Sequence, residues 1–130
     1  LAHPFDSDIY HYGYEDIVLI LDLKKHNIPI THIENPAFHL NLEKSGIFLE
    51  KFHSSLENLK LIIDKKIIAS EDTSLTKTYA KIEQLKLVGF AAFLFKIFKK
   101  TFTKNLLSKK PSIFLFDLYR LGYFCQLNHR

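Results

Sequence analysis

Apolar residues recur every three or four positions through the middle of this chain. The clearest run is Phe48, Phe52, Leu56, Leu59 and Ile63, with Lys, Glu and Ser residues between them. This spacing gathers the apolar side chains on one face of an α-helix and leaves the polar ones on a solvated face. We therefore expect a long helix here, in a chain that is mostly helical.

Two further helices are predicted downstream. The stretch SEDTSLTK, residues 70–77, offers Asp72 or Thr73 as the N-cap of a helix that continues through Leu85. Whether this helix extends into the apolar stretch 87–102 is left open by the spacing.

The last predicted helix restarts after Pro111, with Ser112 as its cap. Cys125 has no second cysteine to pair with and matches no metal or redox spacing, so we expect a small core residue. The residues that this helix is expected to bury are Phe114, Leu115, Leu118, Leu121 and either Tyr123 or Phe124.

The front of the chain predicts a helix over residues 15–26. Acids stand in its first turn and Lys24, Lys25 and His26 in its last, which is the order that the helix dipole favours. Asn27 then provides a left-handed stop.

A short strand is predicted to follow this helix. Residues 28–33, IPITHI, alternate apolar and polar side chains, and Pro29 restricts such a strand to a sheet edge or a first position. Residues 34–39, ENPAFH, predict a turn, because Pro36 disfavours helical backbone at Asn35.

The 130 residues match the length of one domain. The chain contains no methionine, at its start or elsewhere, which favours a piece cut from a longer protein. Residues 1–9 lack the pattern of a secretory signal, so we expect no export.

Positive charge is concentrated in one block. Residues 86–110 contain seven lysines and no acid, whereas residues 1–85 hold thirteen of the fourteen acids. The block is a solvated helix face or a contact with an anionic membrane surface through Lys96, Lys99, Lys100 and Lys104. The nine apolar residues LVGFAAFLF are too few to span a bilayer. Nucleic acid is not an expected partner, because the block has no arginine and the chain no binding motif.

The stretch HYGYED, residues 11–16, sets two tyrosines around Gly13 and then places Glu15 and Asp16 side by side before an apolar run. Taken alone it fits an ordinary turn and helix start, in which the acids complement the dipole.

Several quoted stretches together resemble a known family. These are YGYED, a helix ending in LKKHNI, ITHIENPAFHLNLE, FLEKFHSSLENL and the tail PSIFLFDLYRLGYFC. In this order they resemble the C-terminal part of bacterial family 2 glycosyltransferases, inverting enzymes of the GT-A fold. The resemblance runs from Phe5 to about Cys125. It implies an acceptor-side end of the catalytic domain in residues 1–43 and a helical C-terminal region, one compact unit, in residues 44–130. The implied fold is a mostly α, helical C-terminal segment of a GT-A α/β enzyme, with one short strand or hairpin near the N-terminus.

The resemblance also implies roles for single residues. Asp16 would be the base that takes the proton of the acceptor hydroxyl, and Glu15 a clamp that accepts a hydrogen bond from the acceptor, although the two assignments can be exchanged. Adjacent helix residues point in different directions, so the two acids should not share one task. Acceptor binding would use Tyr12 and Tyr14 as ring faces and Gly13 for close approach of the backbone.

A metal ligand is the last role that the family implies. GT-A enzymes add a late histidine to the Asp-x-Asp pair that holds a divalent metal, manganese or magnesium, on the diphosphate. His39 is the candidate here, with His32 as the weaker one.

One feature of the family is absent. No Asp-x-Asp with a preceding strand lies ahead of YGYED, because Asp6-Ser7-Asp8 stands too close to the acid pair. We therefore expect the nucleotide-sugar donor and the metal to bind elsewhere in a parent enzyme, no cofactor in this segment, and no catalysis by the segment alone.

The parent would act on a glycan or lipid-linked acceptor in the cytoplasm, as a peripheral protein at the inner face of the membrane. The alternative is a non-catalytic helical module for protein interaction or membrane docking.

Overall fold

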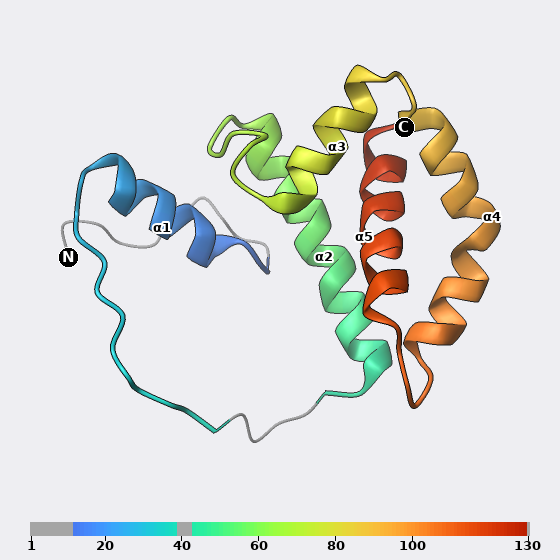
Figure 1. Cartoon of the computed structure of the whole chain (residues 1–130), viewed down its shortest axis with the longest axis horizontal. Coiled ribbons are helices and arrows are strands. Elements are labelled where there is room, and N and C mark those ends of the chain that lie inside the picture. Colours follow the sequence, from blue (N-terminus) through green and yellow to red (C-terminus); the bar gives the residue numbers. More distant parts are fainter. Residues whose placement is uncertain (1–11, 39–42, 130) are drawn as a thin grey trace. The chain divides into compact units, whose positions relative to one another are not determined.

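All regular structure in the described part of the chain is α-helical. The computed structural model describes residues 12–38 and 43–129. The helices are α1 (Glu15–Lys25), α2 (Ser45–Asp64), α3 (Ser74–Gln84), α4 (Val88–Leu106) and α5 (Ile113–Asn128), as Figure 1 shows. The prediction of a mostly helical chain is therefore confirmed for these residues.

The chain divides into two compact units, Leu1–Ile62 and Ile63–Arg130. The first unit holds α1 and nearly all of α2, and the second holds α3, α4 and α5. The division at residues 43 and 44 concerns functional parts and stays a prediction.

The predicted strand is wrong. Residues 28–38 have no regular structure, and no strand occurs anywhere in the residues that the structure describes. Ile30 is 42% exposed and Ile33 is 77% exposed, so the alternating pattern buries no apolar face. A strand is held by hydrogen bonds to a neighbouring strand, and the part of the chain that the structure describes provides none. The predicted turn is also missing from residues 34–38.

The two ends of α1 form as the charge order predicts. Glu15 and Asp16 occupy the first turn and Lys24 and Lys25 the last. Asn27 adopts the left-handed region, with φ 54°, and its N–H donates to the Lys24 carbonyl at 3.0 Å. The left-handed stop at Asn27 is therefore confirmed.

The second unit begins with a capped helix. Thr73 is the N-cap of α3, and its hydroxyl accepts a hydrogen bond from the Thr76 N–H at 3.1 Å. In return the Thr76 hydroxyl accepts from the Thr73 N–H at 3.3 Å, which completes a capping box. The helix that begins at Ser74 does not extend into the apolar stretch 87–102. Lys86 has φ 58°, which interrupts the helix, and α4 starts separately at Val88.

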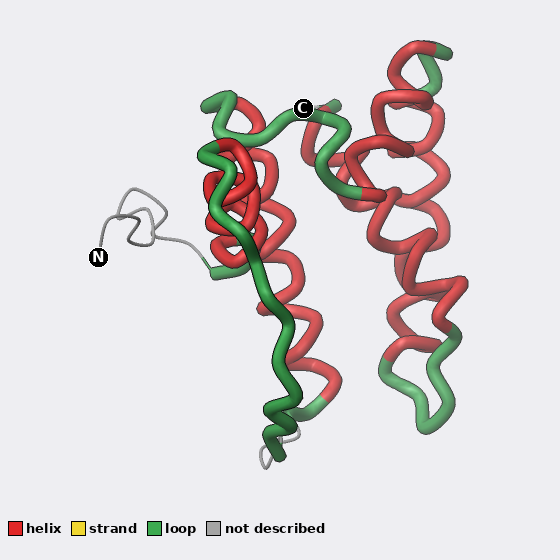
Figure 2. The backbone as a smooth tube through the Cα atoms, turned by 60° about the vertical axis from the view of Figure 1, so that its left-hand side comes forward, coloured by secondary structure: helices red, strands yellow, loops and turns green. Residues whose placement is uncertain are grey.

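The helices α4 and α5 form an antiparallel pair, seen side by side in Figures 1 and 2. Phe95 of α4 is 2% exposed and meets the Tyr119 ring edge-on, with 5.1 Å between ring centroids. On the other side of α5, Tyr79 of α3 meets Phe124 edge-on, also at 5.1 Å. These aromatic contacts join the three helices of the second unit into one core.

The start of α5 agrees with the prediction, but its buried face only partly does. Ser112 is the N-cap, and its hydroxyl accepts from the Leu115 N–H at 3.4 Å. Phe114 is 69% exposed and Leu118 39% exposed, whereas both were expected in the core. The buried residues of α5 are Tyr119, Gly122, Phe124 and Cys125. Because α5 is apolar on nearly all sides, spacing alone did not select the face that packs against α3 and α4.

Cys125 is a core residue, as predicted. Its side chain has no exposed surface and forms no disulfide. Burial raises the pKa of the thiol to about 11, because the charged thiolate is disfavoured away from water. None of the helices in residues 12–38 and 43–129 is long and apolar enough to cross a membrane.

Changing Gly122 to alanine should destabilise the second unit. A Cβ at this position would lie 2.6 Å from the Phe95 ring and 2.7 Å from the Phe95 Cβ, so α4 and α5 would have to separate. Overpacking of this kind costs about 1–3 kcal/mol, which urea unfolding followed by circular dichroism would measure. Gly46→Ala is the control, since nothing lies within 4 Å of its new methyl group. Equal stability of both variants would show that the two helices absorb the methyl group without cost.

Candidate functional site

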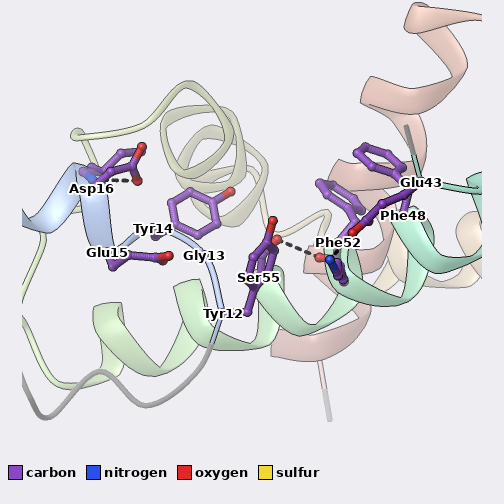
Figure 3. Close-up of a pocket in the computed structure, with 11 residues that line it drawn as sticks. Tyr12, Gly13, Tyr14, Glu15, Asp16, Glu43, Phe48, Phe52 and Ser55 are labelled. Carbon is purple, nitrogen blue, oxygen red and sulfur yellow. Dashed lines mark hydrogen bonds and ion pairs between the residues drawn. The ribbon is translucent and has the colours of Figure 1, made fainter. Parts of the chain in front are cut away.

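A pocket of about 490 Å³ lies in the first unit, beside the start of α1. Figure 3 shows its walls, which come from the turn and first residues of α1 on one side and from α2 on the other. All five residues predicted for catalysis and acceptor binding line this pocket. They are Tyr12, Gly13, Tyr14, Glu15 and Asp16.

Gly13 brings the backbone directly against α2. Its φ is +96°, and a Cβ built there would lie 2.5 Å from the Cβ of Ser55. The Gly13 carbonyl accepts a hydrogen bond from the side-chain amide of Asn58, a residue only 3% exposed. The close approach expected of this glycine is therefore an approach to α2, and it fixes one wall of the pocket.

Tyr14 carries unusual backbone geometry for a bulky residue. It is the N-cap of α1, has φ 71°, and makes no capping hydrogen bond with its side chain. A left-handed conformation costs a residue other than glycine roughly 1–2 kcal/mol. Such strain concentrates at functional positions, where surrounding contacts hold it in place.

The two acids lie in different surroundings. The Oε2 atom of Glu15 has almost no exposed surface and no hydrogen-bond partner among residues 12–38 and 43–129. Asp16 is exposed, and its Oδ1 accepts a hydrogen bond from the Ile17 N–H at 2.8 Å. Figure 3 shows Glu15 extending toward α2 and the Asp16 carboxylate turning back to its own helix. A buried acceptor without a donor costs free energy that a ligand hydroxyl or amine would recover.

A charged pair stands at another side of the pocket. Lys51 forms an ion pair with Glu43, and its ammonium lies 5.6 Å from the centroid of the Tyr12 ring. The hydrogen bond with Glu43 raises the pKa of Lys51, so this side chain stays positively charged at neutral pH. The pocket therefore offers a donor as well as acceptors.

Several pocket residues were missed by the sequence prediction. Phe48 was expected in the core, but it is 49% exposed and stacks on Phe52 with 6.2 Å between ring centroids. The aromatic pair at i and i+4 was a visible signal, yet apolar periodicity assigned both rings to the core. Ser55 and Lys51 carried no local signal, because only the fold brings α2 to residues 12–17.

The metal prediction is not tested by the structure. His39 lies outside the described residues, and His32 is exposed in the irregular segment after α1. Among residues 12–38 and 43–129, no group of three or more His, Cys, Asp or Glu side chains could hold a metal ion.

Comparisons with known proteins add no relative. No protein-family model matches the chain, and no curated protein or solved structure matches it.

Proposed function

We propose that this chain is the acceptor-side, C-terminal part of an inverting glycosyltransferase of the family 2 type. The observation that carries the proposal is a pocket lined by two neighbouring acids and by exposed aromatic rings, in which Glu15 Oε2 has no hydrogen-bond partner among the described residues. The resemblance of residues 5–125 to that family is the second support.

The chemistry of the pocket suits a sugar. Sugars present hydroxyl groups to carboxylates and C–H faces to aromatic rings, and Tyr12, which is 58% exposed, provides such a face. Lys51 can donate to a sugar oxygen from beside the same ring. A volume of about 490 Å³ lies within the range of small-ligand pockets.

In the proposed reaction an acceptor hydroxyl is held by Glu15 and loses its proton to Asp16. The hydroxyl oxygen attacks the anomeric carbon of the donor sugar from the face opposite the diphosphate. A carbon–oxygen bond forms while the bond to the diphosphate breaks, and the nucleoside diphosphate leaves with the electron pair. General-base help of this kind contributes roughly 10²- to 10⁴-fold in rate. Donor and divalent metal belong to the parent's nucleotide-binding part.

The surroundings of the two acids support this division of roles. Glu15 lines the pocket, and its Oε2 accepts no hydrogen bond from the described residues, which suits a carboxylate that turns to hold a neutral hydroxyl. Asp16 is oriented by the Ile17 N–H and is open to water, so it can release the proton it has taken. The competing function is a helical interaction module. In that case the hydrogen bond from the Ile17 N–H to Asp16 would only be part of an ordinary helix start.

Titration of the 130-residue chain with methyl glycosides tests the proposal. We expect methyl glycosides of glucose, galactose or N-acetylglucosamine to shift the NMR signals of residues 12–17. The Glu15→Ala variant should bind at least about 10-fold more weakly, because a hydrogen bond to a charged group is lost. The matched control is Glu50→Ala, an exposed acid of α2 that does not line the pocket.

Nucleotide sugars form the second arm of this experiment. Uridine diphosphate glucose or guanosine diphosphate mannose, with manganese, should not bind with useful affinity, since one histidine candidate gives the metal too few ligands. Micromolar binding would contradict the assignment of the donor site to another part of the parent. The acceptor proposal would fail if none of the glycosides perturbed the pocket signals.

A further inference from the structure

The outer face of α4 carries an apolar stripe made of Phe90, Phe93 and Ile97. These side chains are 60%, 59% and 54% exposed, although they are among the most apolar in the chain. Their spacing of three and four residues places them on one face of the helix. The residues of α4 that are buried, Ala92, Phe95 and Leu106, belong to a different face. The stripe therefore lies mostly outside the packing between α4 and α5. Only Phe93 also borders α5, at a pocket that it lines together with Gln126 and His129.

A row of lysines accompanies the stripe at four-residue spacing. Lys96, Lys100 and Lys104 are all exposed, and none of them forms an ion pair within the described residues. Lys99 differs, because its ammonium lies 6.0 Å and 5.9 Å from the ring centroids of Phe95 and Tyr123. It belongs to the contact between α4 and α5, so the lysine row has three members.

We propose that α4 docks lengthwise on an anionic membrane surface. The stripe would enter the boundary between headgroups and acyl chains, and the lysine row would lie against anionic headgroups. Charge complementarity selects this partner, since residues 86–110 contain seven lysines and no acid. This inference rests on the second unit alone and is independent of the sugar pocket.

The composition of α4 favours a lipid surface over a protein partner. Apart from one glycine, residues 88–104 contain only apolar residues, lysines and two threonines. Protein interfaces are enriched in arginine and depleted of lysine, and they need varied polar groups for specific hydrogen bonds. A fluid layer of anionic headgroups needs only positive charge beside apolar surface.

A tryptophan probe tests where α4 lies. The chain contains no tryptophan, so Phe93→Trp introduces a single fluorophore into the stripe. With vesicles of equal parts phosphatidylcholine and phosphatidylglycerol at low salt, its emission should shift to the blue and be quenched by brominated phosphatidylglycerol. Leu61→Trp is the control, because Leu61 is 43% exposed on α2. Its emission should change little.

The lysine row is tested by vesicle co-sedimentation. The triple variant Lys96→Gln, Lys100→Gln, Lys104→Gln should bind acidic vesicles roughly 100-fold more weakly, since each lysine near the surface contributes about 1 kcal/mol and 1.4 kcal/mol is tenfold. The matched control removes the same charge elsewhere in the second unit. It is Lys65→Gln, Lys77→Gln, Lys81→Gln, and it should bind like the native chain.

Four results would overturn the proposal. The first is no binding to acidic vesicles at low salt, and the second is equally strong, salt-independent binding to neutral vesicles. The third is the same loss of vesicle affinity in both triple variants. The fourth is self-association that buries the stripe between two copies of the chain. Analytical ultracentrifugation without lipid detects the last of these. Circular dichroism of each variant shows that the helices are retained, as expected for changes at exposed positions.

Discussion

Replacing Asp16 by asparagine in the parent enzyme is expected to abolish sugar transfer and to leave the fold intact. The amide keeps the shape of the carboxylate and can still accept the hydrogen bond from the Ile17 N–H, which measures 2.8 Å. It cannot take up a proton at neutral pH, so the acceptor oxygen loses its base. The expected loss is about 10²- to 10⁴-fold in kcat, measured as the initial rate of transfer at saturating donor and acceptor.

Glu15→Gln in the same enzyme should act mainly on acceptor binding. If Glu15 only holds the acceptor hydroxyl, its loss weakens ground state and transition state alike, so the acceptor KM rises more than kcat falls. Glu50→Gln, outside the pocket, should leave both parameters unchanged. A larger fall of kcat in Glu15→Gln than in Asp16→Asn would exchange the roles of the two acids. Near-normal turnover by Asp16→Asn would remove that residue from the mechanism.

Local signals in the sequence were sufficient for several helix ends, although they did not separate α3 from α4. The cap at Thr73, the cap at Ser112 and the left-handed stop at Asn27 are each set by residues within one turn of the helix end. Helix caps and stops depend on neighbouring residues only, so a sequence pattern is enough to predict them. The apolar spacing in residues 48–63 identified α2 for the same reason.

Long-range contacts were beyond the reach of these signals. Alternation in residues 28–33 describes a face that a strand could bury, but it does not provide the partner strand that would hold it. On α2, periodicity assigned Phe48 to the core, whereas the structure gives this ring to the pocket with 49% of its surface exposed. The hydrogen bond from Asn58 to the Gly13 carbonyl joins residues 45 positions apart, so no local sequence pattern could predict it.

The helix α5 illustrates a second limit. Residues 113–125 are apolar at most positions, so several faces satisfy the same spacing. The choice of Tyr119 and Gly122 over Phe114 and Leu118 depends on Phe95, which occupies the space that a side chain at position 122 would need. A small residue opposite a large one is a property of two helices together.

Gly13→Ala is expected to be more destabilising than Gly122→Ala, and its effect should fall on the first unit. Alanine would have to adopt φ +96°, which costs roughly 1–2 kcal/mol, and its Cβ would meet the Ser55 Cβ at 2.5 Å, which adds roughly 1–3 kcal/mol. The turn at residues 12–14 should then lose its contact with α2. Native-state hydrogen exchange would report this as lost protection in α1, and methyl glycoside binding should weaken in parallel.

A double-mutant cycle separates the two costs. Ser55→Gly removes the Cβ that the new methyl group would strike, so in the Gly13→Ala, Ser55→Gly double variant only the backbone strain at position 13 should remain. The coupling free energy between the two changes should be about 1–3 kcal/mol, because residues in direct contact do not add independently. Simple additivity would mean that the backbone at Gly13 does not lie against Ser55. The pocket wall formed by residues 12–14 would then be lost, and with it the position of the Glu15 carboxylate on which the acceptor site depends.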